Sequence, residues 1–279
     1  MTHYIAAYDT ERMTGLHSAT PSCAEACEAI VAIHKKHRMP ATFFIVGQVL
    51  EDAPDTYKRL LDDPLFEVAS HTWSHRMLKD NPFCGKAVPP DSIREEIFRG
   101  REAVQRHFPD RNCRGLRPGC SFVDGLKDAP QVLELVAEAG YEYVSSMAWG
   151  PDYTLPAPLN QAFAYTDDGF PQLYEYPCHG WHDNVLKSMS KPGYWTEPRR
   201  LVAFPPPYPE AIPPAPITTP QDEFRYNNQV FIDRAKRDRL AYVSLIWHPW
   251  SLGLFDPEMK MLDITFTYVR AQGLQPTTF

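Results

Sequence analysis

Short apolar segments alternate with helical segments along this chain of 279 residues. Strands are expected at 4–8, 41–46, 66–70, 113–117, 141–145, 173–176 and 240–247. Helices are expected at 22–38, 54–62, 91–108, 130–139, 222–239 and 257–272. An alternation of about seven strands with helices predicts an α/β fold, a parallel sheet wound by βα units. Periodicity alone does not separate an open sheet from a barrel. In both, ligands bind at the carboxyl ends of the strands.

Composition narrows the class of protein. The net charge of −7 argues against a nucleic-acid partner and against binding to an anionic membrane surface. No apolar run approaches the roughly 20 residues needed to span a bilayer. The first nine residues lack the basic and apolar regions of a secretion signal. We therefore expect one cytoplasmic domain, 1–279, large enough to bury a full core.

Cysteine and proline usage add two expectations. The six cysteines at 23, 27, 84, 113, 120 and 178 form no CxxC pair. This spacing argues against a thiolate zinc site, and in a cytoplasm all six are expected to be reduced. Many of the 28 prolines lie between 204 and 220, where neither a regular helix nor a central strand can form. We expect a loop or arm at about 200–221, which could cover its own site or reach a neighbouring subunit of a homo-oligomer.

Polar and aromatic side chains follow five of the expected strands. In chain order these groups are Asp9-Thr10-Glu11, then His71 and His75, then Arg117-Pro118-Gly119, then His179, Trp181, His182 and Asp183, and last His248-Pro249-Trp250. Strand ends with only a structural role would carry turn residues instead. Because the carboxyl ends of parallel strands meet at one edge, these groups predict an active site there.

The histidine pair suggests a metal. If the chain is helical at 71–75, the spacing puts both imidazoles on one face, and two imidazoles are half of a transition-metal site. Asp9 and Glu11 are two residues apart in an extended segment, so both point the same way. Glu11, His71 and His75 would complete a site with open positions for water and substrate. Such a metal lowers the pKa of water and polarises a carbonyl, and Asp9 would serve as the base.

Hydrolysis of an amide also needs an acid for the departing amine, and His248 is the candidate. Arg117 either orients a carboxylate or forms a structural salt bridge. His179, His182 and Asp183 either extend the substrate site or replace a missing contact. Several aromatic residues near strand ends could line the substrate: Trp149, Trp181, Tyr194, Trp195 and Trp250.

The order of the motifs carries a family resemblance. It runs from Asp9-x-Glu11 through ATFF at 41–44, SHTWSH at 70–75 and RPG at 117–119 to the strand that ends in His248. In this order, over roughly 3–250, the chain resembles the polysaccharide deacetylase family, carbohydrate esterase family 4. The segment GYEYVSSM at 140–147 is similar to the G-[FY]-x-Y-D-S-S-[LM] segment of its peptidoglycan-deacetylase and allantoinase-like branches.

The resemblance implies a single deformed (β/α) barrel with about seven parallel strands. It implies a divalent metal, usually zinc, with His71 and His75 as ligands. It also implies Asp9 as the base, His248 as the acid and Arg117 as the residue that braces the base.

Two departures from the family pattern leave questions open. Many members have two adjacent aspartates, whereas this chain has Asp9 and Thr10, so the third ligand is Glu11, Asp9 or Thr10. Val144 replaces the aspartate of the family's YDSS segment, so another group must orient the acid. In the family, a backbone N–H near the RP pair often binds the oxyanion, and here Gly119 or Cys120 would donate it.

The leading prediction is a metal-dependent hydrolase of a non-peptide C–N bond, N-deacetylating an acetylated amino sugar. One alternative is hydrolysis of a small cytoplasmic ureide or cyclic amide. The other is a non-catalytic relative that binds carbohydrate. Candidate substrate contacts are Gly119, Cys120, Trp149, Trp181, His182 and Trp250.

Overall fold

The computed structural model describes residues 1–12, 22–188 and 198–279. Seven parallel strands form its main sheet: β1 (His3–Thr10), β2 (Ala41–Ile45), β3 (Phe66–Ser70), β4 (Gly115–Leu116), β5 (Tyr143–Val144), β7 (Phe170–Glu175) and β8 (Tyr242–Trp247). They follow the order β7-β5-β4-β3-β2-β1-β8. The antiparallel β6 (Phe163–Tyr165) lies beside β7, and β9 (Gln275–Thr277) pairs with the start of β1. The predicted α/β class and the number of parallel strands are confirmed.

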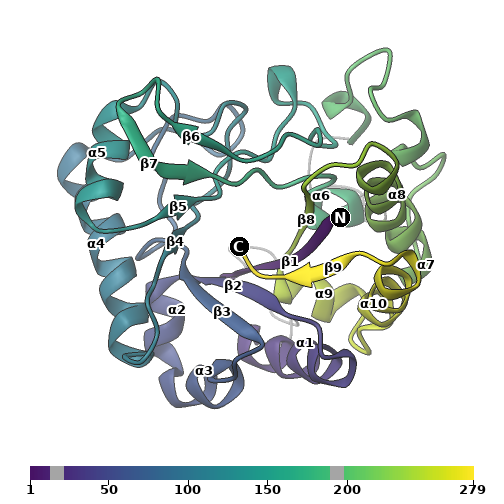
Figure 1. Cartoon of the computed structure of the whole chain (residues 1–279), viewed down its shortest axis with the longest axis horizontal. Helices are drawn as coiled ribbons and strands as arrows, with labels where there is room; N and C mark the ends of the chain where they lie inside the picture. Colours follow the sequence, from purple (N-terminus) through teal and green to yellow (C-terminus); the bar gives the residue numbers. More distant parts are fainter. Residues whose placement is uncertain (13–21, 189–197) are drawn as a thin grey trace.

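The strands curve around a common centre (Figure 1). No regular ladder joins β7 to β8 among the described residues. Instead, the chain after β7 continues as irregular backbone, and Cys178 N–H donates to Met147 O at 2.8 Å. His179 then forms a single parallel bridge to Leu245 of β8. The ring is therefore completed by irregular chain, which confirms the deformed barrel.

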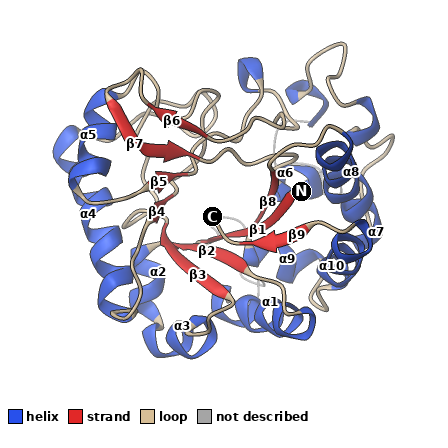
Figure 2. Ribbon diagram, viewed as in Figure 1, coloured by secondary structure: helices blue, strands red, loops and turns tan. Residues whose placement is uncertain are grey.

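Helices cover the outside of the ring (Figure 2). They are α1 (Cys23–His37), α2 (Gly47–Asp52), α3 (Pro54–Leu61), α4 (Pro90–His107), α5 (Pro130–Glu138), α6 (Asp183–Ser188), α7 (Pro220–Glu223), α8 (Val230–Arg237), α9 (Pro249–Phe255) and α10 (Lys260–Gln272). Ser22 begins α1 with a capping box, because its Oγ accepts from Glu25 N–H and Glu25 accepts from Ser22 N–H. No helix of the described ranges is long and apolar enough to cross a membrane.

Aromatic side chains fill one end of the barrel. Phe279 packs against Phe44, Tyr143 and Tyr176, with ring centroids 5.6 to 6.4 Å apart across this cluster. Figure 1 shows the C-terminus at the centre of the ring. The polar side chains singled out in the sequence lie instead at the carboxyl ends of the strands.

Some elements differ from the sequence-based expectation. The strand expected at 113–117 is shorter in the structure, where β4 has only two residues, Gly115–Leu116. The helix expected at 257–272 begins at Lys260, because Met259 adopts a left-handed backbone with φ +53°. The helix expected at 222–239 begins two residues earlier, capped by Thr219, and contains a π-helical segment, Phe224–Gln229. The short elements α2, α6, α9, β6 and β9 were not predicted.

The proline-rich segment forms short 3₁₀ turns at Pro198–Leu201 and Pro209–Ala211 and no regular strand, as expected. It packs on the loop at 155–159 and on Trp181. Tyr208 OH accepts from Leu159 N–H at 3.1 Å, and Leu155 N–H donates to Leu201 O at 2.8 Å. Among its described residues, none lines the cavity described below.

The expectation that all cysteines are reduced is wrong for one pair. Cys84 and Cys120 form a disulfide, because a tight turn at Asn81–Gly85 brings their Cα atoms to 6.5 Å. The other four cysteines are free: Cys23, Cys27, Cys113 and Cys178.

Candidate active site

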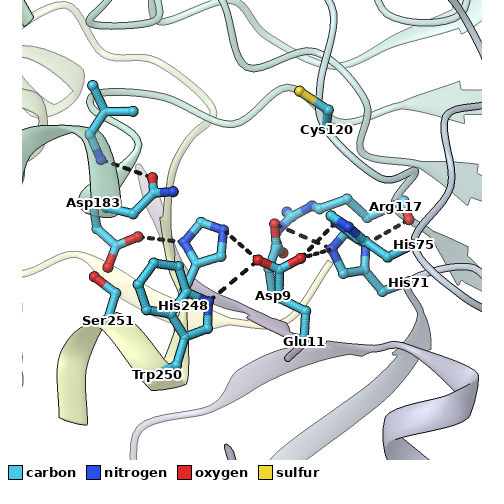
Figure 3. A network of polar contacts seen from close by, with 12 residues as sticks. Asp9, Glu11, His71, His75, Arg117, Cys120, Asp183, His248, Trp250 and Ser251 are labelled. Carbon is cyan, nitrogen blue, oxygen red and sulfur yellow. Dashed lines mark hydrogen bonds and ion pairs between the residues drawn. The ribbon is translucent and has the colours of Figure 1, made fainter. Parts of the chain in front are cut away.

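Asp9 and Glu11 lie at the carboxyl end of β1 and point to the same side, as their spacing predicts (Figure 3). Asp9 Oδ1 accepts from Arg117 Nη1 at 2.5 Å, and both side chains are buried. Burial raises the pKa of Asp9, but the adjacent Arg117 charge outweighs it, so the pKa lies below its usual range. Asp9 is therefore ionised.

His71 and His75 converge on Glu11 without a helix. The segment between them is irregular, and Thr72 and His75 have φ values of +63° and +64°. Glu11 Oε2 lies 2.6 Å from His75 Nε2 and 3.8 Å from His71 Nε2. Ligand atoms of these three residues all lie within 4.8 Å of one another. The helical interpretation of 71–75 is wrong, but the predicted grouping is present.

The three residues fit a divalent metal. His71 Nδ1 is bonded to Arg117 O at 2.8 Å; because a carbonyl only accepts, Nδ1 carries the proton. Nε2 then presents a lone pair, and this atom is buried with no hydrogen-bond partner among the described residues. Burial lowers the pKa of His71 to about 4, so the ring is neutral near pH 7. Two imidazole nitrogens and a carboxylate are a donor set that zinc and similar metals take.

The other candidates for the third ligand are less available. Asp9 is held by Arg117, which also donates to Ser145 Oγ at 3.0 Å and Cys178 Sγ at 2.9 Å. The Thr10 side chain lies near Cys27 of α1, on the other side of the strand. This arrangement supports Glu11.

His248 follows β8 and faces Glu11 from the opposite side to the histidine pair (Figure 3). Its Nε2 lies 3.6 Å from Glu11 Oε1, and its Nδ1 lies 2.6 Å from Asp183 Oδ1. Burial lowers the pKa of His248, but the Asp183 carboxylate outweighs burial and raises the pKa to about 9. Val144 lies buried in β5, and Asp183 from α6 makes the contact to the histidine.

A buried network of charged side chains continues from the Asp183–His248 pair. Lys187 Nζ is 2.8 Å from Asp183 Oδ2 and 3.0 Å from Glu223 Oε1. All three side chains are more than nine-tenths buried. Lys187 and His248 outweigh the effect of burial and keep the pKa of Asp183 below its usual range. The sequence analysis missed Lys187 and Glu223, although the i,i+4 spacing of Asp183 and Lys187 is a signal for an ion pair on α6.

A cavity of about 630 Å³ opens beside these groups. Among the candidates, its lining includes Asp9, Glu11, His75, Cys120, Trp149, His182, His248 and Trp250. His71 and Arg117 are buried and do not line the cavity. His71 lies 3.8 Å from Glu11 and Arg117 bonds Asp9, and both of these carboxylates line it. Trp250 Nε1 also lies 3.4 Å from Glu11 Oε1.

Three candidates lie elsewhere. Trp181 is buried beneath the proline-rich segment, and its indole N–H donates to Ala211 O at 2.9 Å. His179 closes the barrel, accepting from Ser244 N–H at 3.0 Å. Gly119 packs against the backbone of the loop that carries His75, where an added Cβ would lie 2.7 Å from His75 O. Tyr194 and Trp195 lie outside the described residues.

Part of the chain is similar to a known protein family. A model described as Polysaccharide deacetylase matches residues 18–144, a range that includes the histidine pair and the RPG segment. The matched range is just under half of the chain, so the similarity to that family is shown for this part. The chitooligosaccharide deacetylase of Rhizobium leguminosarum bv. phaseoli is 31% identical over 80 residues, 29% of this chain and 32% of the relative. The chitooligosaccharide deacetylase of Sinorhizobium fredii is 27% identical over 88 residues, which are 32% of this chain and 37% of the relative. The match thus spans about a third of these curated relatives.

Two solved structures that cover nearly the whole chain have a similar fold. An allantoinase has a TM-score of 0.66 at 14% identity, covering 99% of this chain and 86% of the other. A probable polysaccharide deacetylase from Pseudomonas aeruginosa has a TM-score of 0.63 at 12% identity, covering 99% and 87%. At these identities the likeness shows the deformed barrel alone.

Proposed function

We propose that this protein is a metal-dependent hydrolase of non-peptide C–N bonds that removes the acetyl group of an acetylated amino sugar. The observation that carries the proposal is the grouping around Glu11. His71, His75 and the ionised Asp9 lie on one side of this carboxylate, and a protonated His248 lies on the other. Relatives described as chitooligosaccharide deacetylases support the substrate class.

Each side chain has a separate task in this proposal. Glu11, His71 and His75 would hold a divalent metal, zinc in our proposal. When bound, it supplies Lewis-acid polarisation of the amide carbonyl and lowers the pKa of water. Asp9, kept ionised by Arg117, accepts the proton of the attacking water.

The leaving amine needs a proton, and His248 supplies it from Nε2. Asp183 fixes the orientation of the ring by accepting from Nδ1–H, so that Nε2 faces the cavity. For the oxyanion, the backbone N–H of Cys120 is favoured over that of Gly119, because Cys120 lines the cavity and Gly119 does not.

A second candidate is hydrolysis of a small ureide or cyclic amide. The cavity volume of about 630 Å³ favours it, because this is the size of a site for one compact ligand. A non-catalytic binding role is less favoured, because the base, the acid and all three metal ligands are present together. A cytoplasmic location and a homo-oligomer stay predictions.

Acetate release and ring opening separate the candidates. Zinc-loaded protein is given an acetylated chitooligosaccharide and, separately, a cyclic ureide. We expect acetate release, and Asp9→Asn should lower kcat at least about 100-fold. Asp110→Asn, which changes an exposed aspartate, is the matched control. Wild-type rates in Asp9→Asn would overturn the assignment of the base, and turnover of the ureide alone would favour the second candidate.

A further inference from the structure

One wall of the cavity is built by a tight turn at Asn81–Gly85. Asn81 and Gly85 exchange two backbone hydrogen bonds of 2.9 Å, and Asn81 Oδ1 accepts from the N–H groups of Phe83 and Cys84. Asn81 Nδ2 donates to Ser121 O at 2.7 Å, from the loop that follows the RPG segment. The turn therefore has a defined shape and is attached to a loop of the active site.

The disulfide is a second attachment. Cys84 and Cys120 both line the cavity, and their bond joins positions 36 residues apart. Phe83 precedes Cys84, so its backbone is held between the Asn81 hydrogen bonds and the disulfide. A loop fixed in this way loses little conformational entropy when a ligand binds.

Phe83 is unusual for its exposure. Its side chain is 41% exposed, yet its ring stacks on Trp149 with centroids 5.4 Å apart and planes 7° apart. Trp149 is nearly fully buried, and both residues line the cavity. An exposed aromatic ring held rigidly at a cavity is a common arrangement for ligand contact.

Trp149 supplies an independent polar signal. Its indole N–H is buried and has no hydrogen-bond acceptor among the described residues. Leaving such a donor unsatisfied costs about 1–3 kcal/mol, which an acceptor on a ligand would offset. Beside it, with ring centroids 4.6 Å apart, His182 donates from Nε2–H to Ala148 O at 2.9 Å. Burial lowers the pKa of His182 to about 4, so its Nδ1 is an acceptor near pH 7.

We propose that Phe83 and Trp149 form the wall that selects the substrate, and that the Cys84–Cys120 disulfide fixes Phe83 in that wall. The inference rests on the proposed function and deepens it. The ligand it fits is a single amino-sugar ring. One C–H face of the ring packs on Phe83, and an oxygen of the sugar accepts from Trp149 Nε1–H.

Binding and turnover test the wall together. Calorimetry gives Kd for N-acetylglucosamine on the zinc-loaded full chain, and steady-state kinetics give KM and kcat for an acetylated chitooligosaccharide. We expect Phe83→Ala to raise Kd and KM about tenfold with kcat changed less than about twofold. Trp149→Phe keeps a ring and removes the donor, and it should raise Kd about fivefold or more. Hydrolysis of p-nitrophenyl acetate, which has no sugar ring, should fall by a smaller factor than sugar deacetylation in both variants.

The disulfide has its own variant pair. The double substitution Cys84→Ser with Cys120→Ser should raise KM about threefold or more, and Cys23→Ser, which changes a free cysteine, should leave KM unchanged. If the wild type binds the sugar and neither Phe83→Ala nor Trp149→Phe alters Kd, the wall is overturned while the proposed function stands. If the wild type binds only a ureide, the sugar assignment is overturned. The Kd of the same variants for the ureide then tests whether Phe83 and Trp149 bind the ligand.

Discussion

Asp183 Oδ1 lies 2.6 Å from His248 Nδ1, and the two residues are 65 positions apart in the chain. The resemblance of 140–147 to the family's YDSS segment implied a carboxylate at the position of Val144, which has none. Here the carboxylate that contacts the histidine comes from the start of α6 instead. The acid of the proposed reaction therefore has a partner from a different element.

Asp183→Asn tests that partnership. Without the carboxylate, the imidazolium form of His248 loses its stabilising charge, so proton donation to an amine should suffer. We expect amide hydrolysis to fall roughly 10- to 100-fold. Hydrolysis of p-nitrophenyl acetate should change less than about threefold, since p-nitrophenolate departs without a proton. Equal loss on both substrates would mean that Asp183 has only a structural role, and Asp110→Asn is again the control.

Gly119→Ala tests how the RPG segment supports the metal site. A Cβ at this position would lie 2.7 Å from His75 O and 3.2 Å from Arg76 O, both backbone atoms that have little room to move. His75 should shift, and we expect zinc affinity to fall about 10- to 100-fold, as for other changes behind metal ligands. Competition with a chromogenic chelator measures it. An unaltered affinity would show that the His75 loop adjusts freely.

Arg117→Lys tests the bracing of the base. The guanidinium bonds Asp9, Ser145 and Cys178 at once and packs on the ring of Phe44 at 4.0 Å. A lysine has neither the planar fork nor the reach for all of these partners. We expect kcat to fall about tenfold or more with KM nearly constant. A rise in KM with kcat unchanged would place Arg117 in substrate binding instead.

Buried His34 predicts a loss of stability in acid. Its ring bonds Met39 O through Nδ1 and Tyr8 OH through Nε2, each at 2.7 Å, and burial lowers its pKa to about 4. Because the unfolded chain takes up this proton near pH 6.5, stability is full above pH 6.5 and falls as pH drops toward 4. At pH 5 the loss from this residue is about 2 kcal/mol.

Urea unfolding between pH 7.5 and pH 4.5 measures this dependence. His34→Gln should reduce the slope of stability with pH, whereas His3→Gln, at an exposed position of the same β1 strand, should not. Parallel curves for wild type and His34→Gln would contradict the neutral state of His34.

The sequence predicts the barrel and the grouping of the candidate metal ligands because both follow from short-range patterns. Alternating apolar strands specify the parallel sheet, and the ends of its strands must meet at one edge. The spacing of Asp9 and Glu11 specifies their common side in extended backbone. The convergence of His71 and His75 did not need the helix that we expected, because two left-handed residues, Thr72 and His75, turn the chain.

Contacts between loops that are far apart in the chain could not be predicted from the sequence. Nothing local to Cys84 indicates that a turn at Asn81–Gly85 faces Cys120, so the disulfide could not be predicted from spacing. For the same reason, Phe83 carries no motif that marks it as a cavity residue. Trp181 looked like a substrate contact because it follows a strand, yet the packing of the proline-rich segment buries it.

Removal and return of metal tests the central claim most directly. Acetate release from an acetylated chitooligosaccharide is measured on metal-loaded protein, after exhaustive chelation, and after zinc is returned. His71→Gln is measured in parallel, with His3→Gln as the control. The account predicts that chelation abolishes acetate release and that zinc restores it in the wild type and His3→Gln but not in His71→Gln. Acetate release that persists in metal-free protein would contradict it.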